Sequence, residues 1–207
     1  GTFGEKVFRL RGVNKKWEGR KFSELDEVDQ LQLKDSVLRA TIVQQLDPQD
    51  DSSIYHVFER LNTGGVKLNP MEVRRCVFFG PLVSVLEKLN ENEKWREIIG
   101  KKIIDIGFKD VELILRILAL HDGWEKYEKP MKEFLNRYMT KNKQIDEDGL
   151  HAITNNFTNG IDKIHTALGA KPFHLKGRLN YAVMDSVFVA ALGSGDTHNL
   201  KEKYDHL

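Results

Sequence analysis

Cysteine, long apolar runs and net charge are all scarce in this sequence. The single cysteine among 207 residues, Cys76, excludes an internal disulfide framework and is typical of a reducing compartment. No run of about 18 apolar residues is present, so no transmembrane helix is expected, and the N-terminus lacks the charged and apolar regions of a signal peptide. A formal net charge of +1 argues against a protein that coats a polyanion. We therefore expect a cytoplasmic protein with no membrane partner.

Several motifs of catalysis and cofactor binding are missing as well. The sequence contains neither a GxxxxGK[ST] phosphate-binding loop nor a dinucleotide fingerprint, and it has no serine-hydrolase signature. Its seven histidines include no pair at the i, i+3 or i, i+4 spacing that would place two metal ligands on one helical face. Cys76 lies among apolar residues, which predicts a small buried side chain rather than a reactive thiol.

The composition is that of an ordinary globular protein, with 40% hydrophobic and 30% charged residues. A chain of 207 residues suits one domain or two small ones. The charge is unevenly distributed, because residues 1–22 carry a net charge of +5 and residues 23–60 one of −6. This asymmetry fits either a basic segment that complements an acidic helix within the molecule or a local edge that faces DNA.

The apolar pattern predicts a mainly α fold, a helical bundle with a small N-terminal β-sheet (α+β). Short strands are expected at Lys6–Leu10 and Val37–Leu46, and Trp17–Phe22 is expected to be a second strand or an extended return. A helix capped by Ser23 is expected between Trp17–Phe22 and Val37–Leu46. After residue 51 every element is expected to be helical. The most apolar helix, which we expect Asp110 to cap, is predicted to lie at the centre of the bundle. We predict a β-containing subdomain at 1–50, a helical bundle at 51–195 and a frayed tail at 196–207.

The most strongly specified stretch lies between residues 51 and 80. Ile54, Val57, Phe58 and Leu61 recur at the spacing of one helical face. Residues 62–65, Asn-Thr-Gly-Gly, then end that helix. A second helix follows at once, since Asn69 is a good N-cap, Pro70 suits the first turn and Glu72 completes a capping box. Two helices are therefore predicted to meet at a tight glycine loop.

This corner has the chemistry to hold a phosphate group. Gly64 and Gly65 expose backbone N–H groups, and the start of the second helix adds a partial positive charge. Nearby cations would neutralise the anion; they are Arg60, Lys67, Arg74 and Arg75. The alternative is a helix–loop–helix corner with solvated arginines, because double-glycine turns are common.

A family resemblance bears on this choice. Residues 58–65, Phe-Glu-Arg-Leu-Asn-Thr-Gly-Gly, and 68–74, Leu-Asn-Pro-Met-Glu-Val-Arg, resemble the signature F-E-R-L-N-T-G-G-x-x-L-x-P-x-E-[IV]-R. That signature marks the N-terminal domain of GmrSD-type modification-dependent restriction endonucleases, in the ParB/sulfiredoxin-like superfamily and long described as a domain of unknown function. Residues 112–118 and 134–139 also resemble the family's later D-x-E-x-x-L-R and F-L-N-x-Y-M stretches.

The resemblance implies a nucleotide-dependent DNA endonuclease that acts in defence against foreign or modified DNA. It implies a nucleoside triphosphate with Mg²⁺ as cofactor and DNA as partner. Asn62 would contact metal and phosphate with Glu59 as a second ligand, although Leu61 stands where the ParB box has glutamate. Thr63, Gly64 and Gly65 would contribute backbone N–H groups.

The family's upstream Asp-Gly-Gln-Arg motif is not found in this chain. The resemblance therefore implies the C-terminal part of a ParB-like domain, inactive without its upstream segment, whose partner is that segment or another copy of the chain. The alternative is a non-enzymatic helical module that binds DNA or a protein.

Overall fold

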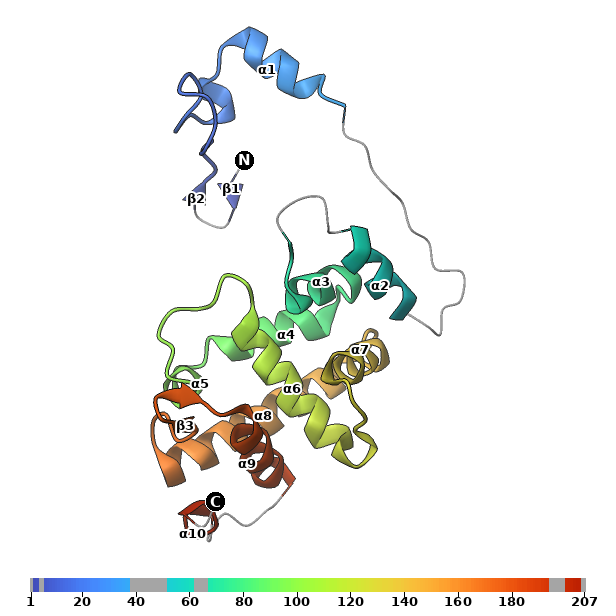
Figure 1. Cartoon of the computed structure of the whole chain (residues 1–207), viewed down its shortest axis with the longest axis vertical. Helices are drawn as coiled ribbons and strands as arrows, with labels where there is room; N and C mark the ends of the chain where they lie inside the picture. The colour runs from blue at the N-terminus through green and yellow to red at the C-terminus, as the bar shows by residue number, and fades with distance from the viewer. Residues whose placement is uncertain (1, 4–5, 38–51, 62–66, 194–199, 206–207) are drawn as a thin grey trace. The chain divides into compact units, whose positions relative to one another are not determined.

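The computed structural model describes residues 2–3, 6–37, 52–61, 67–193 and 200–205 (Figure 1). The chain divides into an N-terminal unit, Gly1–Val43, and a C-terminal unit, Gln44–Leu207. The described ranges are mainly helical with small antiparallel two-stranded sheets, which confirms the predicted fold class. None of the helices in those ranges is both long and apolar enough to cross a membrane. The predicted strand Val37–Leu46 lies, from residue 38 onward, outside the described residues.

The N-terminal unit begins with a small antiparallel pair, β1 (Thr2–Phe3) and β2 (Lys6–Val7), so the first predicted strand is confirmed over two residues. The segment Trp17–Phe22 forms no strand, so of the two predicted possibilities the extended return is the one observed. After a turn, the Gly19 amide donates to the Leu10 carbonyl (2.8 Å) and the Leu10 amide to the Arg20 carbonyl (2.9 Å), and the 3-10 helix η1 (Phe22–Glu24) follows. Gly19 has a φ of 75°, a left-handed conformation that ends an extended strand.

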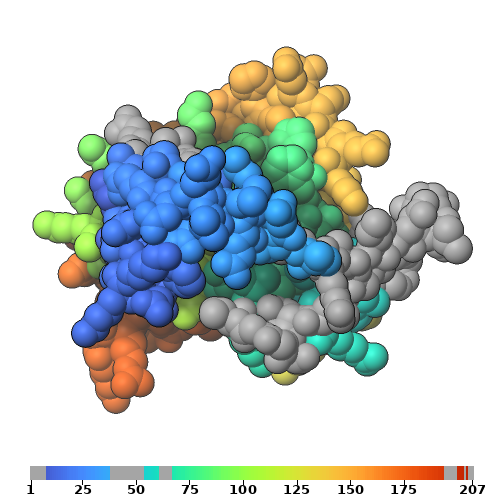
Figure 2. Space-filling model, turned by 90° about the horizontal axis from the view of Figure 1, so that it is seen from above, coloured from blue at the N-terminus to red at the C-terminus, as the bar shows by residue number. Residues whose placement is uncertain are grey.

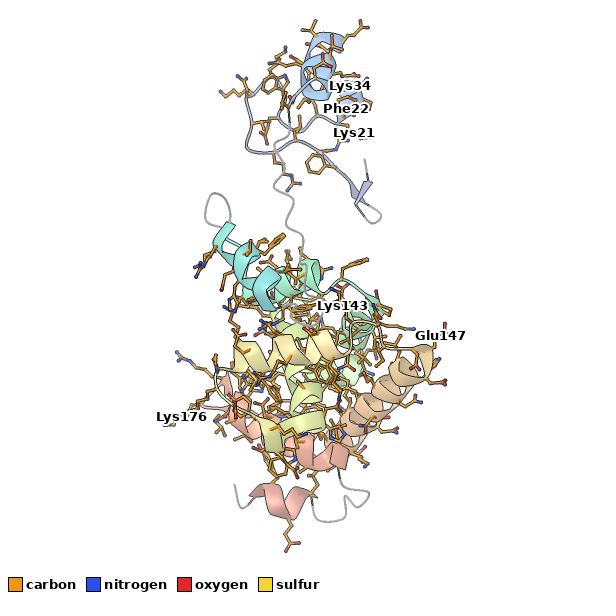
Figure 3. All side chains as sticks on the ribbon, turned by 90° about the vertical axis from the view of Figure 1, so that its right-hand side faces the viewer. Lys21, Phe22, Lys34, Lys143, Glu147 and Lys176 are labelled. Carbon is orange, nitrogen blue, oxygen red and sulfur yellow. The ribbon has the colours of Figure 1, made fainter. Side chains whose placement is uncertain are left out.

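The helix of the N-terminal unit, α1 (Glu27–Lys34), begins four residues after the predicted cap, Ser23. Asp29 anchors it, because its carboxylate accepts a hydrogen bond from Trp17 Nε1 at 2.8 Å and pairs with Lys16 Nζ at 2.7 Å. Lys34 at the end of α1 lies over the ring of Phe22, 5.7 Å from its centroid (Figure 3). Figure 2 shows one face of this unit in blue.

The C-terminal unit is built from helices joined by short connections. They are α2 (Ser52–Leu61), α3 (Pro70–Val77), α4 (Pro81–Asn90), α5 (Glu93–Ile98), α6 (Lys109–Gly123), η2 (Trp124–Lys126), α7 (Met131–Lys141), α8 (Glu147–Leu168), α9 (Tyr181–Gly193) and α10 (Leu200–Asp205). A hairpin of β3 (His174–Leu175) and β4 (Arg178–Leu179) lies between α8 and α9. Glu147 at the start of α8 and Lys176 in the hairpin point outward (Figure 3).

Helix α6 occupies the centre of this unit, as its apolar sequence predicted (Figure 1). It packs against α3, α4, α7 and α9. An aromatic cluster joins α5, α8 and α9, with the Trp95 and Phe157 ring centroids 5.5 Å apart and those of Trp95 and Phe188 5.8 Å apart. These rings are fully buried, so the cluster stabilises the packing of these three helices.

The predicted cap of α6 is wrong. Phe108 occupies the N-cap position in a left-handed conformation (φ 59°), and Asp110 is fully buried inside the first turn. The Asp110 carboxylate accepts hydrogen bonds from Arg96 Nη1 at 2.5 Å and from the Asp105 amide at 3.0 Å. Burial raises the pKa of Asp110, but these hydrogen bonds outweigh burial and hold the pKa below its ordinary value.

Three other predictions need correction. Cys76 is exposed, because the buried face of α3 carries Met71 and Phe78 and Cys76 lies on the opposite face. The β3–β4 hairpin interrupts a region predicted to be wholly helical. Part of the predicted tail is ordered as α10, where the Tyr204 hydroxyl donates to the Pro172 carbonyl.

Candidate functional site

The helical corner predicted from the signature is formed by α2 and α3. The predicted phosphate-binding residues Asn62, Thr63, Gly64 and Gly65 lie outside the described residues, so the candidate site consists of the side chains that flank them. α2 and α3 pack against each other, and α7 packs against both. The corner therefore rests on the helical bundle.

The start of α3 is closed by its own capping box, as predicted. Asn69 Oδ1 accepts hydrogen bonds from the amides of Met71 (2.9 Å) and Glu72 (3.1 Å), and Glu72 Oε2 accepts one from the Asn69 amide (2.7 Å). Pro70 has no N–H to offer. The expected contribution of this helix start to phosphate binding needs correction, because its first amides already have acceptors and Glu72 adds a negative charge.

Arg74 lies inside the protein, with 1% of its surface exposed. Its Nε donates to Asn136 Oδ1 at 2.9 Å, its Nη1 to Glu112 Oε2 at 2.9 Å and its Nη2 to the Lys132 carbonyl at 3.3 Å. The guanidinium also lies 5.6 Å from the centroid of the Tyr55 ring. Arg74 is therefore engaged through all three of its nitrogens and cannot reach a phosphate in solvent, which corrects its predicted role.

This network joins three stretches that the sequence resemblance picked out separately. Arg74 belongs to the signature, Glu112 to the first downstream stretch and Asn136 to the second. The residues that carry the resemblance thus meet at one buried guanidinium, which gives them a structural role in holding α3, α6 and α7 together.

The other predicted cations divide into two kinds. Arg75 is one-third exposed, donates from Nε to Glu87 Oε1 at 2.6 Å and stacks on Phe108, 3.6 Å from the ring centroid. Arg60, in the last turn of α2, and Lys67, just before α3, are both exposed. Neither makes an ion pair within the described ranges. Of the predicted cations, Arg60 and Lys67 are therefore free to bind an anion, since neither has an ion-pair partner among the described residues.

Glu59, the predicted metal ligand, is held by a lysine. Lys132 Nζ lies 2.6 Å from Glu59 Oε2, and this hydrogen bond holds the pKa of Glu59 below its ordinary value. His56 Nδ1 lies 4.0 Å from the same oxygen. Within the described ranges, no group of three or more His, Cys, Asp or Glu side chains is placed to hold a metal ion.

A pocket of about 370 Å³, the corner pocket, opens between α2 and the start of α3. Its polar and charged lining comes from Tyr55, Glu59, Lys67 and Asn69. Tyr55 is fully buried, burial raises its pKa to about 12, and its hydroxyl has no hydrogen-bond partner among the described residues. Lys132 Nζ lies 4.9 Å from the centre of the Tyr55 ring. Sequence reasoning missed Tyr55 because it expected the face with Val57 and Phe58 to pack inward, and these two side chains are 37% and 39% exposed.

Comparisons with known proteins do not assign this site. No family model matches the chain, no curated protein matches it, and no solved structure matches it. A function for the corner therefore has to be inferred from its own geometry and from the sequence motifs that it contains.

Proposed function

We propose that this chain is the helical part of a nucleotide-dependent DNA endonuclease of the GmrSD type, acting in defence against foreign or modified DNA. The observation that carries the proposal is the meeting of the three family-like stretches at Arg74, whose guanidinium lies 2.9 Å from both Glu112 Oε2 and Asn136 Oδ1. An accidental likeness between short segments would not be expected to bring them to one buried network.

In this proposal the corner supplies phosphate binding and the upstream segment supplies the cleavage chemistry. Arg60 and Lys67 lie close in sequence on either side of residues 62–66 and attract the phosphate by charge. A nucleoside triphosphate would bring its own Mg²⁺, with Asn62 as the proposed contact. No cleavage step is assigned to the described residues, since they form no metal-ligand set.

Neutralising the two free corner cations should weaken DNA binding and its dependence on salt. Each lost phosphate contact lowers the slope of log affinity against log salt by roughly 0.9 for duplex DNA. We expect Arg60→Gln with Lys67→Gln to lower the slope by roughly twice that amount, measured by fluorescence anisotropy with labelled duplex from low to moderate salt. Binding of Mg-ATP should weaken in parallel.

A matched control removes two exposed cations elsewhere. Lys126→Gln with Arg137→Gln changes the net charge equally at positions that do not line the corner pocket. Equal losses in the two double variants would show that the corner has no special role. No binding of DNA or Mg-ATP by the unmodified chain would overturn the proposal for this chain.

A second candidate function is a module that binds a protein partner. The loop between α5 and α6 exposes 85% of Ile103 and 91% of Ile106. Hydrogen bonds hold this loop in place, from Arg96 Nη2 to the Ile103 carbonyl at 2.6 Å and from Asn69 Nδ2 to the Gly107 carbonyl at 2.7 Å. An ordered loop that exposes large aliphatic side chains is typical of a protein contact surface.

A further inference from the structure

A second pocket, the Arg116 pocket, lies between the starts of α3, α6 and α9. It has a volume of about 270 Å³ and shares Asn69 and Pro70 with the corner pocket. The charged and hydroxyl groups in its lining belong to Lys109, Glu112, Arg116 and Tyr181. None of these residues was predicted as a binding residue from the sequence.

Arg116 is held in one orientation by a buried carboxylate. Its Nε donates to Asp185 Oδ2 at 2.6 Å, and only 7% of Asp185 is exposed. The guanidinium also lies over the Tyr181 ring, 6.0 Å from its centroid. Its terminal nitrogens, Nη1 and Nη2, make no hydrogen bond within the described part of the chain. An arginine that is anchored through Nε in this way keeps Nη1 and Nη2 free to bind an anion.

The charge around the pocket favours a negative ligand. The one carboxylate in the lining, Glu112, already pairs with Arg74 at 2.9 Å, and the carboxylate that anchors Arg116 is that of Asp185. Lys109 is exposed and its Nζ has no ion pair among the described residues. Lys109 is therefore the uncompensated charge among the lining residues, which also include Arg116.

We propose that the Arg116 pocket binds a phosphate group. The lining residues Arg116, Lys109 and Tyr181 carry several hydrogen-bond donors, which suit the several oxygens of a tetrahedral oxyanion. A volume of about 270 Å³ is below that of most ligand pockets and suits one phosphate group rather than a whole nucleotide. The phosphate comes from a free phosphate compound or from a DNA backbone. The cations of this site differ from those of the corner, because Arg60 and Lys67 do not line it.

Isothermal titration with inorganic phosphate, in a phosphate-free buffer, tests the pocket directly. Lys109→Gln removes an exposed charge, and Arg116→Lys keeps a cation for Asp185 while removing the free nitrogens. We expect each variant to weaken phosphate binding at least about tenfold, as loss of one charge-assisted hydrogen bond does. Lys102→Gln, which removes an exposed lysine from the loop before α6 and outside the pocket, should bind like the unmodified chain.

A second experiment, with labelled duplex DNA, distinguishes the two sources of the phosphate, a free phosphate compound and a DNA backbone. Loss of both phosphate and DNA binding in Lys109→Gln supports a backbone-phosphate site, and loss of phosphate binding alone supports a free phosphate compound. Equal phosphate affinity in Lys109→Gln, Lys102→Gln and the unmodified chain would overturn the proposal, as would no phosphate binding at all. The corner variants Arg60→Gln and Lys67→Gln should leave phosphate binding to this pocket unchanged.

Discussion

Replacing Asp110 by asparagine is expected to lower the free energy of unfolding by about 3–5 kcal/mol. The change keeps the size of the side chain and removes its charge. Asp110 is fully buried and its partner Arg96 is nearly so, with a 2.5 Å contact between Arg96 Nη1 and Asp110 Oδ2. The guanidinium would be left as a buried charge without a counter-ion. Urea unfolding followed by circular dichroism would measure the effect.

A surface pair provides the control for this change. Lys94 Nζ and Asp162 Oδ1 are also close, at 2.6 Å, but both side chains are about half exposed. Asp162→Asn should therefore change stability by no more than about 1 kcal/mol. A loss in Asp110→Asn as small as that in Asp162→Asn would show that the buried pair is not important for the fold.

The same pair predicts a dependence on pH. Because the pKa of Asp110 is lowered in the folded protein, its contribution to stability is complete above the ordinary aspartate value of about 3.9. The contribution is lost as the pH falls from there through the lower folded-state pKa. Asp110→Asn should therefore lose less stability than the unmodified chain when the pH is lowered from about 5 to about 3, in the same unfolding experiment.

Replacing Arg74 by methionine is expected to lower the free energy of unfolding by about 3 kcal/mol. Methionine fills much of the space, but Asn136 Oδ1 and the Lys132 carbonyl would lose their donor. Glu112 would lose its cation, although its side chain is one-third exposed and water would offset part of that loss. The melting temperature and a urea midpoint together measure the effect.

The neighbouring arginine is the matched control. Arg75→Met removes the same group from the next position of α3, where the Arg75 and Glu87 side chains are both about one-third exposed. We expect it to reduce stability by no more than about 1 kcal/mol. If Arg74→Met folds as stably as Arg75→Met and instead weakens binding of DNA, Arg74 contributes to ligand binding after all.

The burial of Arg74 could have been predicted from spacing. Met71, Arg74 and Phe78 recur at intervals of three and four residues, the period of one helical face, and all three are buried. Its burial was missed because only apolar residues were expected in the core, so the charged Arg74 was assigned to the solvent. Its partners could not be predicted, because they lie 38 and 62 residues away along the chain.

The sequence by itself determined the features that depend on neighbouring residues. The capping box of α3 was predicted because it is completed within three residues. The central place of α6 followed from its apolar composition. Only the tertiary structure decided which charges are buried and which are free, since that depends on the helices that pack together. It paired Arg96 with Asp110 and Arg74 with Glu112, and left Arg60, Lys67 and Lys109 exposed without ion pairs among the described residues.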